Sequence, residues 1–119
     1  MEAEEVLDKG FAAHANVKAR LKRIINGEED ATPESVRADN VCIVGKWIYG
    51  PGQEFSDKGE YSELKTIHAG FHEEAYQALM LFKSGKKNEA MEYVESGPFE
   101  QKSKEIKTAL FAMKKSTKA

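Results

Sequence analysis

The chain has 119 residues, 40% of them hydrophobic and 32% charged, so it is long enough for one domain with its own core and too short for two. Its net charge of −2 gives no general basis for binding nucleic acid or an anionic membrane, and no apolar run approaches the ~18 residues of a membrane span. The single cysteine excludes an internal disulfide, and the first five residues are acidic where a signal peptide would be basic. We therefore expect a cytoplasmic protein.

The first predicted element is a long helix from about Ala3 to Asn26. The sequence Asn26-Gly27 is a good C-terminal stop for it. Residues 28–40 are polar and lack helical periodicity, which predicts a connection with at most one helical turn near Pro33. The residues that recur at three- and four-residue steps along the first helix, and so share one apolar stripe, are Leu7, Phe11, His14, Val17, Leu21 and Ile24.

A short apolar segment, Val41–Tyr49, ends firmly at residues 50–52, which read Gly-Pro-Gly. Periodicity alone would allow a strand or a helix here. Because the chain offers no second strand for pairing, we predict a short helix capped by Asp39 or Asn40.

Three more helices are predicted, over Gly59–Ser84, over Lys86–Glu95 and from Pro98 onward, separated by Gly85 and Gly97. The fold class is therefore all-α: an antiparallel four-helix bundle with an additional short helix that carries the cysteine. We expect one domain over residues 1–119, with a core of about 3–114 and a basic C-terminal tail at 115–119. A solvated tail is favoured over contact with nucleic acid.

The three histidines and the only cysteine of the chain are candidate metal ligands: His14, Cys42, His68 and His72. His68 and His72 are four residues apart, which places both imidazoles on one helix face. Taken singly, each histidine could be a hydrogen-bonded core residue and the cysteine a small buried hydrophobe. However, all three histidines lie on core-facing stripes whose apolar neighbours offer no hydrogen-bond partners, so a shared metal ion explains them together.

Zinc is the best candidate ion, because it accepts thiolate and imidazole ligands in a four-coordinate tetrahedral site. Cu(I) or Co(II) would fit the same ligands, whereas a di-iron site needs repeated Glu-x-x-His or His-x-x-x-His elements, and the chain has no second His-rich helix to complete one. Four protein ligands leave no open position for a reactive water, so we predict that the protein is not an enzyme. Near the ligands, Asp39 could accept a bond from a histidine or cap the short helix, and Ser103 could face the metal or make room for it.

The sequence resembles the chemoreceptor zinc-binding domain family of bacterial sensory modules. The resemblance rests on His14 in the first helix, on residues 42–47 (Cys-Ile-Val-Gly-Lys-Trp) and on residues 68–72 (His-Ala-Gly-Phe-His). It extends over about residues 11–113, and the combination of the three segments is highly specific. Two departures are visible: Val17 stands where the family usually has Trp, and Val44 where it often has Leu.

The resemblance implies one zinc held by three His and one Cys in a homodimeric module, with a chemotaxis receptor or diguanylate cyclase as its signalling partner. The leading hypothesis is therefore a zinc-binding sensory domain that responds to zinc or, through Cys42, to oxidants. The alternative is a zinc-stapled adaptor whose metal never leaves. The chain acts through a separate partner or is a piece of a longer protein.

Overall fold

The structure is a computed structural model that describes residues 3–39 and 42–118, all of whose regular elements are helical. Within this part of the chain no residue is in a strand, and no helix is long and apolar enough to cross a membrane. The all-α class is thus confirmed. The elements are α1 (Ala3–Ile25), α2 (Glu34–Arg37), α3 (Ile43–Ile48), the 3-10 helix η1 (Pro51–Phe55), α4 (Gly59–Lys83), α5 (Lys87–Glu95) and α6 (Pro98–Lys118).

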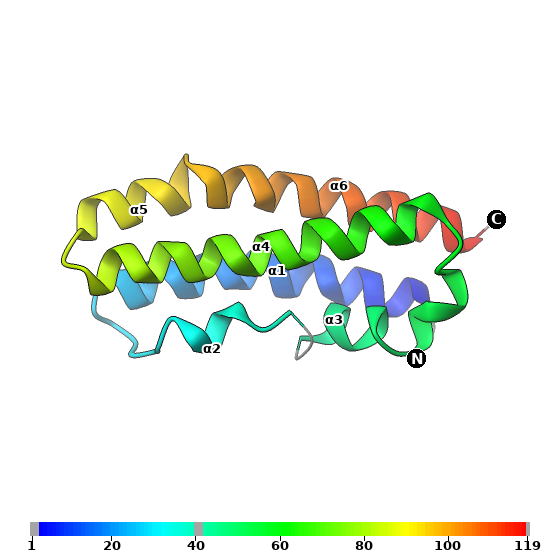
Figure 1. Cartoon of the computed structure of the whole chain (residues 1–119), viewed down its shortest axis with the longest axis horizontal. Coiled ribbons are helices and arrows are strands. Elements are labelled where there is room, and N and C mark those ends of the chain that lie inside the picture. Colours follow the sequence, from blue (N-terminus) through cyan, green and yellow to red (C-terminus); the bar gives the residue numbers. More distant parts are fainter. Residues whose placement is uncertain (1–2, 40–41, 119) are drawn as a thin grey trace.

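The chain passes four times along an elongated bundle that measures 47 × 22 × 19 Å (Figure 1). α1 and α4 run in the same direction, while the row formed by α2 and α3 and the row formed by α5 and α6 run the opposite way. Successive rows are therefore antiparallel. α5 and α6 lie end to end and pack along α4, and α6 continues as a helix through residues 115–118, where a basic tail was expected.

The turns that follow α1 and α4 each depend on a glycine with positive φ. These are Gly27 (80°) and Gly85 (85°). After α1, the Gly27 amide donates to the Ile24 carbonyl and the next amide donates to the Arg23 carbonyl. The same pair of bonds ends α4 around Gly85, so both are Schellman caps. Both predicted helix stops are confirmed.

The short helix α3 begins directly after Cys42, and this corrects the predicted cap. Cys42 is itself the N-cap residue, with its sulfur accepting a hydrogen bond from the Gly45 amide. The Asp39 carboxylate instead accepts the hydroxyl proton of Tyr49 at 2.7 Å, which raises the pKa of Tyr49 to about 12. The Asp39 prediction failed because a thiol was not considered as a cap. Asn40 and Val41 lie outside the described residues.

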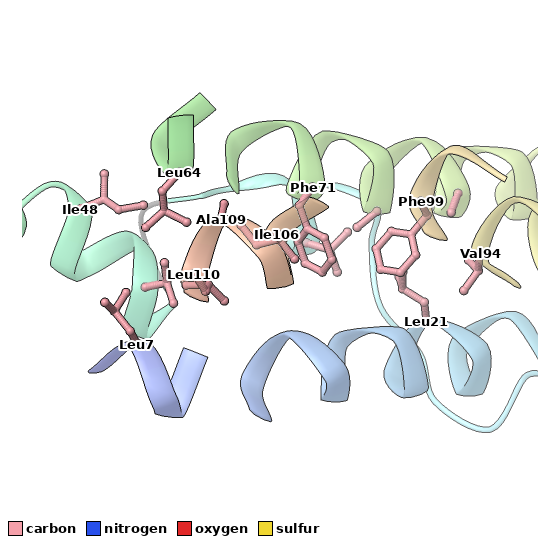
Figure 2. Packing of buried hydrophobic residues seen from close by; sticks show 14 of the residues in the cluster. Leu7, Leu21, Ile48, Leu64, Phe71, Val94, Phe99, Ile106, Ala109 and Leu110 are labelled. Atoms are coloured by element: carbon pink, nitrogen blue, oxygen red, sulfur yellow. The ribbon is translucent and has the colours of Figure 1, made fainter. Parts of the chain in front are cut away.

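The core runs the length of the bundle and is almost entirely aliphatic and aromatic (Figure 2). Near α3, Leu7, Ile48 and Leu64 close one end, and all three are fully buried. In the middle, Phe71 packs against Phe99, with 5.0 Å between ring centroids. Most of the core residues lie on α1, α4 and α6, which pack against one another, and α3 adds Ile48 to the first layer.

α1 and α3 approach each other most closely where Gly10 faces Val44. A Cβ atom at Gly10 would overlap Cγ2 of Val44, so this crossing requires glycine. The contact fixes α3 on α1 within one turn of His14 and two residues after Cys42. It therefore sets the distance between two of the candidate ligands.

We predict that Gly10→Ala lowers the free energy of unfolding by up to about 2 kcal/mol, because overpacking costs about 1–3 kcal/mol and the gain in helix propensity returns only ~1 kcal/mol. Urea denaturation measures the change. Gly59→Ala is the matched control, since no atom lies within 4 Å of a Cβ there. Adding Val44→Ala to Gly10→Ala should recover part of the loss. Equal stability of the two single Gly→Ala variants would contradict the prediction.

Candidate metal centre

Three separate segments bring the four candidate ligands to one place beneath the surface of the bundle. His14 comes from α1, His68 and His72 come from successive turns of α4, and Cys42 comes from the start of α3. One ligand atom from each residue lies within 4.8 Å of all the others. The four side chains therefore form a group able to hold one metal ion.

The spacing of the group suits a tetrahedral site. The Cys42 sulfur lies 3.1 Å from Nε2 of His68 and 3.7 Å from Nε2 of His72. With bond lengths of ~2.0–2.3 Å, zinc needs its ligand atoms about 3.3–3.6 Å apart. The widest separation of 4.8 Å exceeds this by little more than 1 Å, which small rotations of the side chains would close.

Backbone carbonyls set the orientation of two imidazoles. Nδ1 of His14 donates to the Gly10 carbonyl at 2.7 Å, and Nδ1 of His72 donates to the Val36 carbonyl at 3.0 Å. Each bond places the proton on Nδ1 and leaves the lone pair on Nε2, as a metal ligand requires. Nε2 of His14 is buried and has no hydrogen-bond partner among the described residues. That unpaired lone pair in the core is the observation that a metal ion explains best.

His68 differs from the other two histidines. It is fully buried, and its Nε2 atom faces the Cys42 sulfur, while its Nδ1 atom has no partner within the described part of the chain. Among the described residues, the Cys42 sulfur is the only group within hydrogen-bonding distance of the His68 ring. His68 is therefore the imidazole whose orientation depends most on Cys42 and on the ion.

The electrostatics of the metal-free site keep all four groups neutral. Burial raises the pKa of the Cys42 thiol, an effect that the Gly45 amide partly offsets. Burial also lowers the pKa of His14 to about 4, that of His68 to about 2 and that of His72 below its usual value. Neutral imidazoles are ready to bind a metal, whereas the thiol must first lose its proton, which a bound cation favours.

A short helix braces the site from outside. α2 contributes the Val36 carbonyl that orients His72, and Val36 itself is buried. The next residue, Arg37, pairs with Glu73 at 3.2 Å and lies 4.4 Å above the ring of Tyr76, both on α4. These contacts hold α2 against the helix that carries two of the candidate ligands.

Sequence reasoning identified the four side chains but not the groups that orient them. Asp39 bonds to Tyr49 and to none of the histidines, and although Ser103 is buried as expected, no hydrogen bond joins it to the group in the described structure. The backbone carbonyls of Gly10 and Val36 do this work instead. A carbonyl carries no side-chain signal, although Gly10 lies four residues before His14, a spacing that brings the two together in a helix.

Comparison with protein families places this group in a known domain. The family model described as the chemoreceptor zinc-binding domain matches residues 14–79, more than half of the chain and a range that contains all four side chains. The chain belongs to this family, whose members bind zinc and act in signal transduction. Comparison with curated proteins and with solved structures found no match.

We predict that the metal-free protein loses stability as the pH falls. The three histidines have lowered pKa values in the folded chain and ordinary ones, near 6.5, in the unfolded chain. The unfolded state therefore binds more protons below about pH 6.5, and the slope approaches ~1.4 kcal/mol per pH unit for each histidine. Urea titrations of chelator-treated protein between about pH 7 and about pH 5 measure it. His68→Asn should make the dependence of stability on pH less steep, because it removes one of the three histidines. A stability independent of pH would contradict the lowered pKa values of the histidines.

Proposed function

We propose that this member of the chemoreceptor zinc-binding domain family holds one zinc ion through His14, Cys42, His68 and His72, and that the state of this site regulates a signalling partner. The observation that carries the proposal is the convergence of four metal-binding atoms within 4.8 Å. Independent support comes from the buried Nε2 lone pair of His14, which has no partner in the described chain. The family match supports zinc rather than Cu(I) or Co(II).

The proposed role is regulatory rather than catalytic. Zinc hydrolases keep a coordination position open for the water that they activate. Here three imidazoles and one thiolate would fill a tetrahedral shell. A closed shell suits a site whose occupancy changes the structure around it.

The ion would join α1, the start of α3 and α4 at one point. Cys42 starts α3, and His72 donates to Val36 of α2, so both short helices are joined to the site. Loss of zinc, or oxidation of the Cys42 sulfur to a weaker ligand, would release α3 from α4. We propose that this local rearrangement is the signal that a partner reads.

The partner belongs to the proposal as well. We propose an output protein such as a chemoreceptor or a diguanylate cyclase, which the family match supports, and a homodimer in the cytoplasm. A reducing cytoplasm suits the site because it keeps the only cysteine as a free thiol that can bind metal.

A zinc-stapled adaptor is the competing function, and the burial of all three histidines favours it. The two functions differ in how fast the ion exchanges. A sensor loses zinc to a chelator whose affinity is near that of the cellular zinc buffer, whereas an adaptor keeps it. Zinc transfer to such a chelator, followed over time, separates them.

We predict one zinc per chain in native mass spectrometry of the purified protein, and none after treatment with a strong chelator. Cys42→Ala and His14→Ala should each weaken zinc binding strongly, because each removes a ligand. Glu63→Gln is the matched control, because it neutralises an exposed carboxylate on α4, the helix of His68 and His72, that lies outside the group. A metal-free wild-type protein that also fails to take up added zinc would overturn the proposal.

We further predict that chelation increases amide exchange in α3 before it affects the core of α6. A structural zinc in small peptides contributes ~10–16 kcal/mol, and in this fold Cys42 conveys that stabilisation to the start of α3. Hydrogen exchange with mass spectrometry compares residues 43–48 with residues 106–110 in the same sample. Equal amide protection of α3 with and without zinc would contradict the proposal that α3 responds to the loss of the ion.

A further inference from the structure

Solvent can approach the candidate metal centre from one side. His14 is 2% exposed, His68 is fully buried and His72 is 6% exposed, whereas Cys42 is only partly buried. Any molecule that exchanges with a bound ion must bring a donor atom close to it. The side of Cys42 and His72 is therefore where such an atom would enter.

A pocket opens at that side. It has a volume of about 170 Å³ and lies between α1 and the segment that contains α2. Cys42 and His72 form part of its lining, while His14 and His68 do not. A water molecule needs only ~10–15 Å³, and an apolar cavity of ~150 Å³ admits benzene, so the pocket has room for a small ligand.

The walls of the pocket are mainly apolar. Val17 and Leu21 of α1 face Val36 and Ala38 on the other side, and Arg20 and Ser35 add polar groups. Leu21 and Val36 are buried in the core, but Val17 is only partly buried. Val17 lies about one helical turn after His14 on the same face of α1, and it lines the pocket together with Cys42 and His72.

We propose that this pocket is the passage through which zinc and its competing ligands, small thiols and carboxylates, reach and leave the metal centre, and that Val17 sets its width. The inference rests on the proposed zinc site and adds a kinetic role for a residue that is not a ligand. An incoming donor atom binds the ion from the pocket as the Cys42 sulfur or a His72 nitrogen leaves it. The size of residue 17 then controls the rate of exchange, with little effect on the four ligand atoms.

The test is the rate at which zinc passes from loaded protein to an excess of a small chromophoric carboxylate chelator, in stopped flow. Val17→Trp, the largest apolar replacement, should release zinc about tenfold more slowly, which corresponds to an added barrier of ~1.4 kcal/mol. Val17→Ala should release it faster. Ala19→Trp introduces the same side chain at an exposed position on the same helix, away from the pocket, and should match the wild type.

A second readout needs no metal. In the chelator-treated protein, Val17→Trp should slow modification of Cys42 by a small thiol reagent, and Val17→Ala should speed it. If Val17→Trp does not fold by circular dichroism, the Val17→Ala comparison decides both assays. Rates equal to wild type in the folded variants would overturn the passage, as would zinc release that follows the unfolding rate of each variant.

The two proposals fail in different ways. A wild-type protein that never binds zinc would overturn the metal site, while the thiol assay would still report whether the pocket controls access to Cys42. A zinc-loaded protein whose release rate ignores residue 17 would leave the metal site intact and overturn the passage alone.

Discussion

Everything distinctive in this bundle depends on placing three neutral imidazoles and a thiol in an apolar interior. Such groups lose their hydrogen bonds to water on burial, and an unpaired buried polar atom costs about 1–3 kcal/mol. The fold satisfies part of this requirement with the carbonyls of Gly10 and Val36. It leaves Nε2 of His14 and Nδ1 of His68 without partners in the described structure. A single cation bound as proposed to Nε2 of His14 would remove the first of these costs and would join three segments of the chain. The free energy of metal binding would thus add directly to the stability of this part of the fold.

The rest of the bundle can be understood as support for that arrangement. α4 supplies two adjacent turns with one histidine each, and Phe71 between them packs edge-on against His14, with 4.8 Å between ring centroids. Gly10 lets α3 approach α1 so closely that Cys42 reaches the same point. Arg37 holds α2 on α4, so that a carbonyl meets the outer nitrogen of His72. In the proposed site, Cys42 would join the start of α3 directly to the ion, so α3 would gain stability when zinc binds.

Much of the fold and of the site could be predicted from the sequence, because apolar residues spaced three and four apart indicate where a long helix lies and which of its faces is buried. The stripe Phe99, Ser103, Ile106, Leu110 and Met113 is buried as its spacing indicates, and both glycine stops end helices. The convergence of the histidines followed from their places on such stripes. The predicted cap of α3 was wrong, because the N-cap residue is Cys42, and cysteine is not among the residues that usually cap helices. The Val36 carbonyl and the pocket beside Val17 could not be predicted, since both depend on where α2 lies, and four residues of helix carry no periodic signal.

The central claim is that one zinc ion is bound by three imidazole nitrogens and one sulfur. X-ray absorption at the zinc edge of the loaded protein tests it most directly, because it reports the atoms bound to the metal and their distances. The account predicts one sulfur at ~2.3 Å and three nitrogens at ~2.0–2.1 Å, with the multiple-scattering pattern of imidazole. A shell of nitrogen and oxygen without sulfur would contradict it, since Cys42 would then be no ligand and α3 would have no connection to the ion.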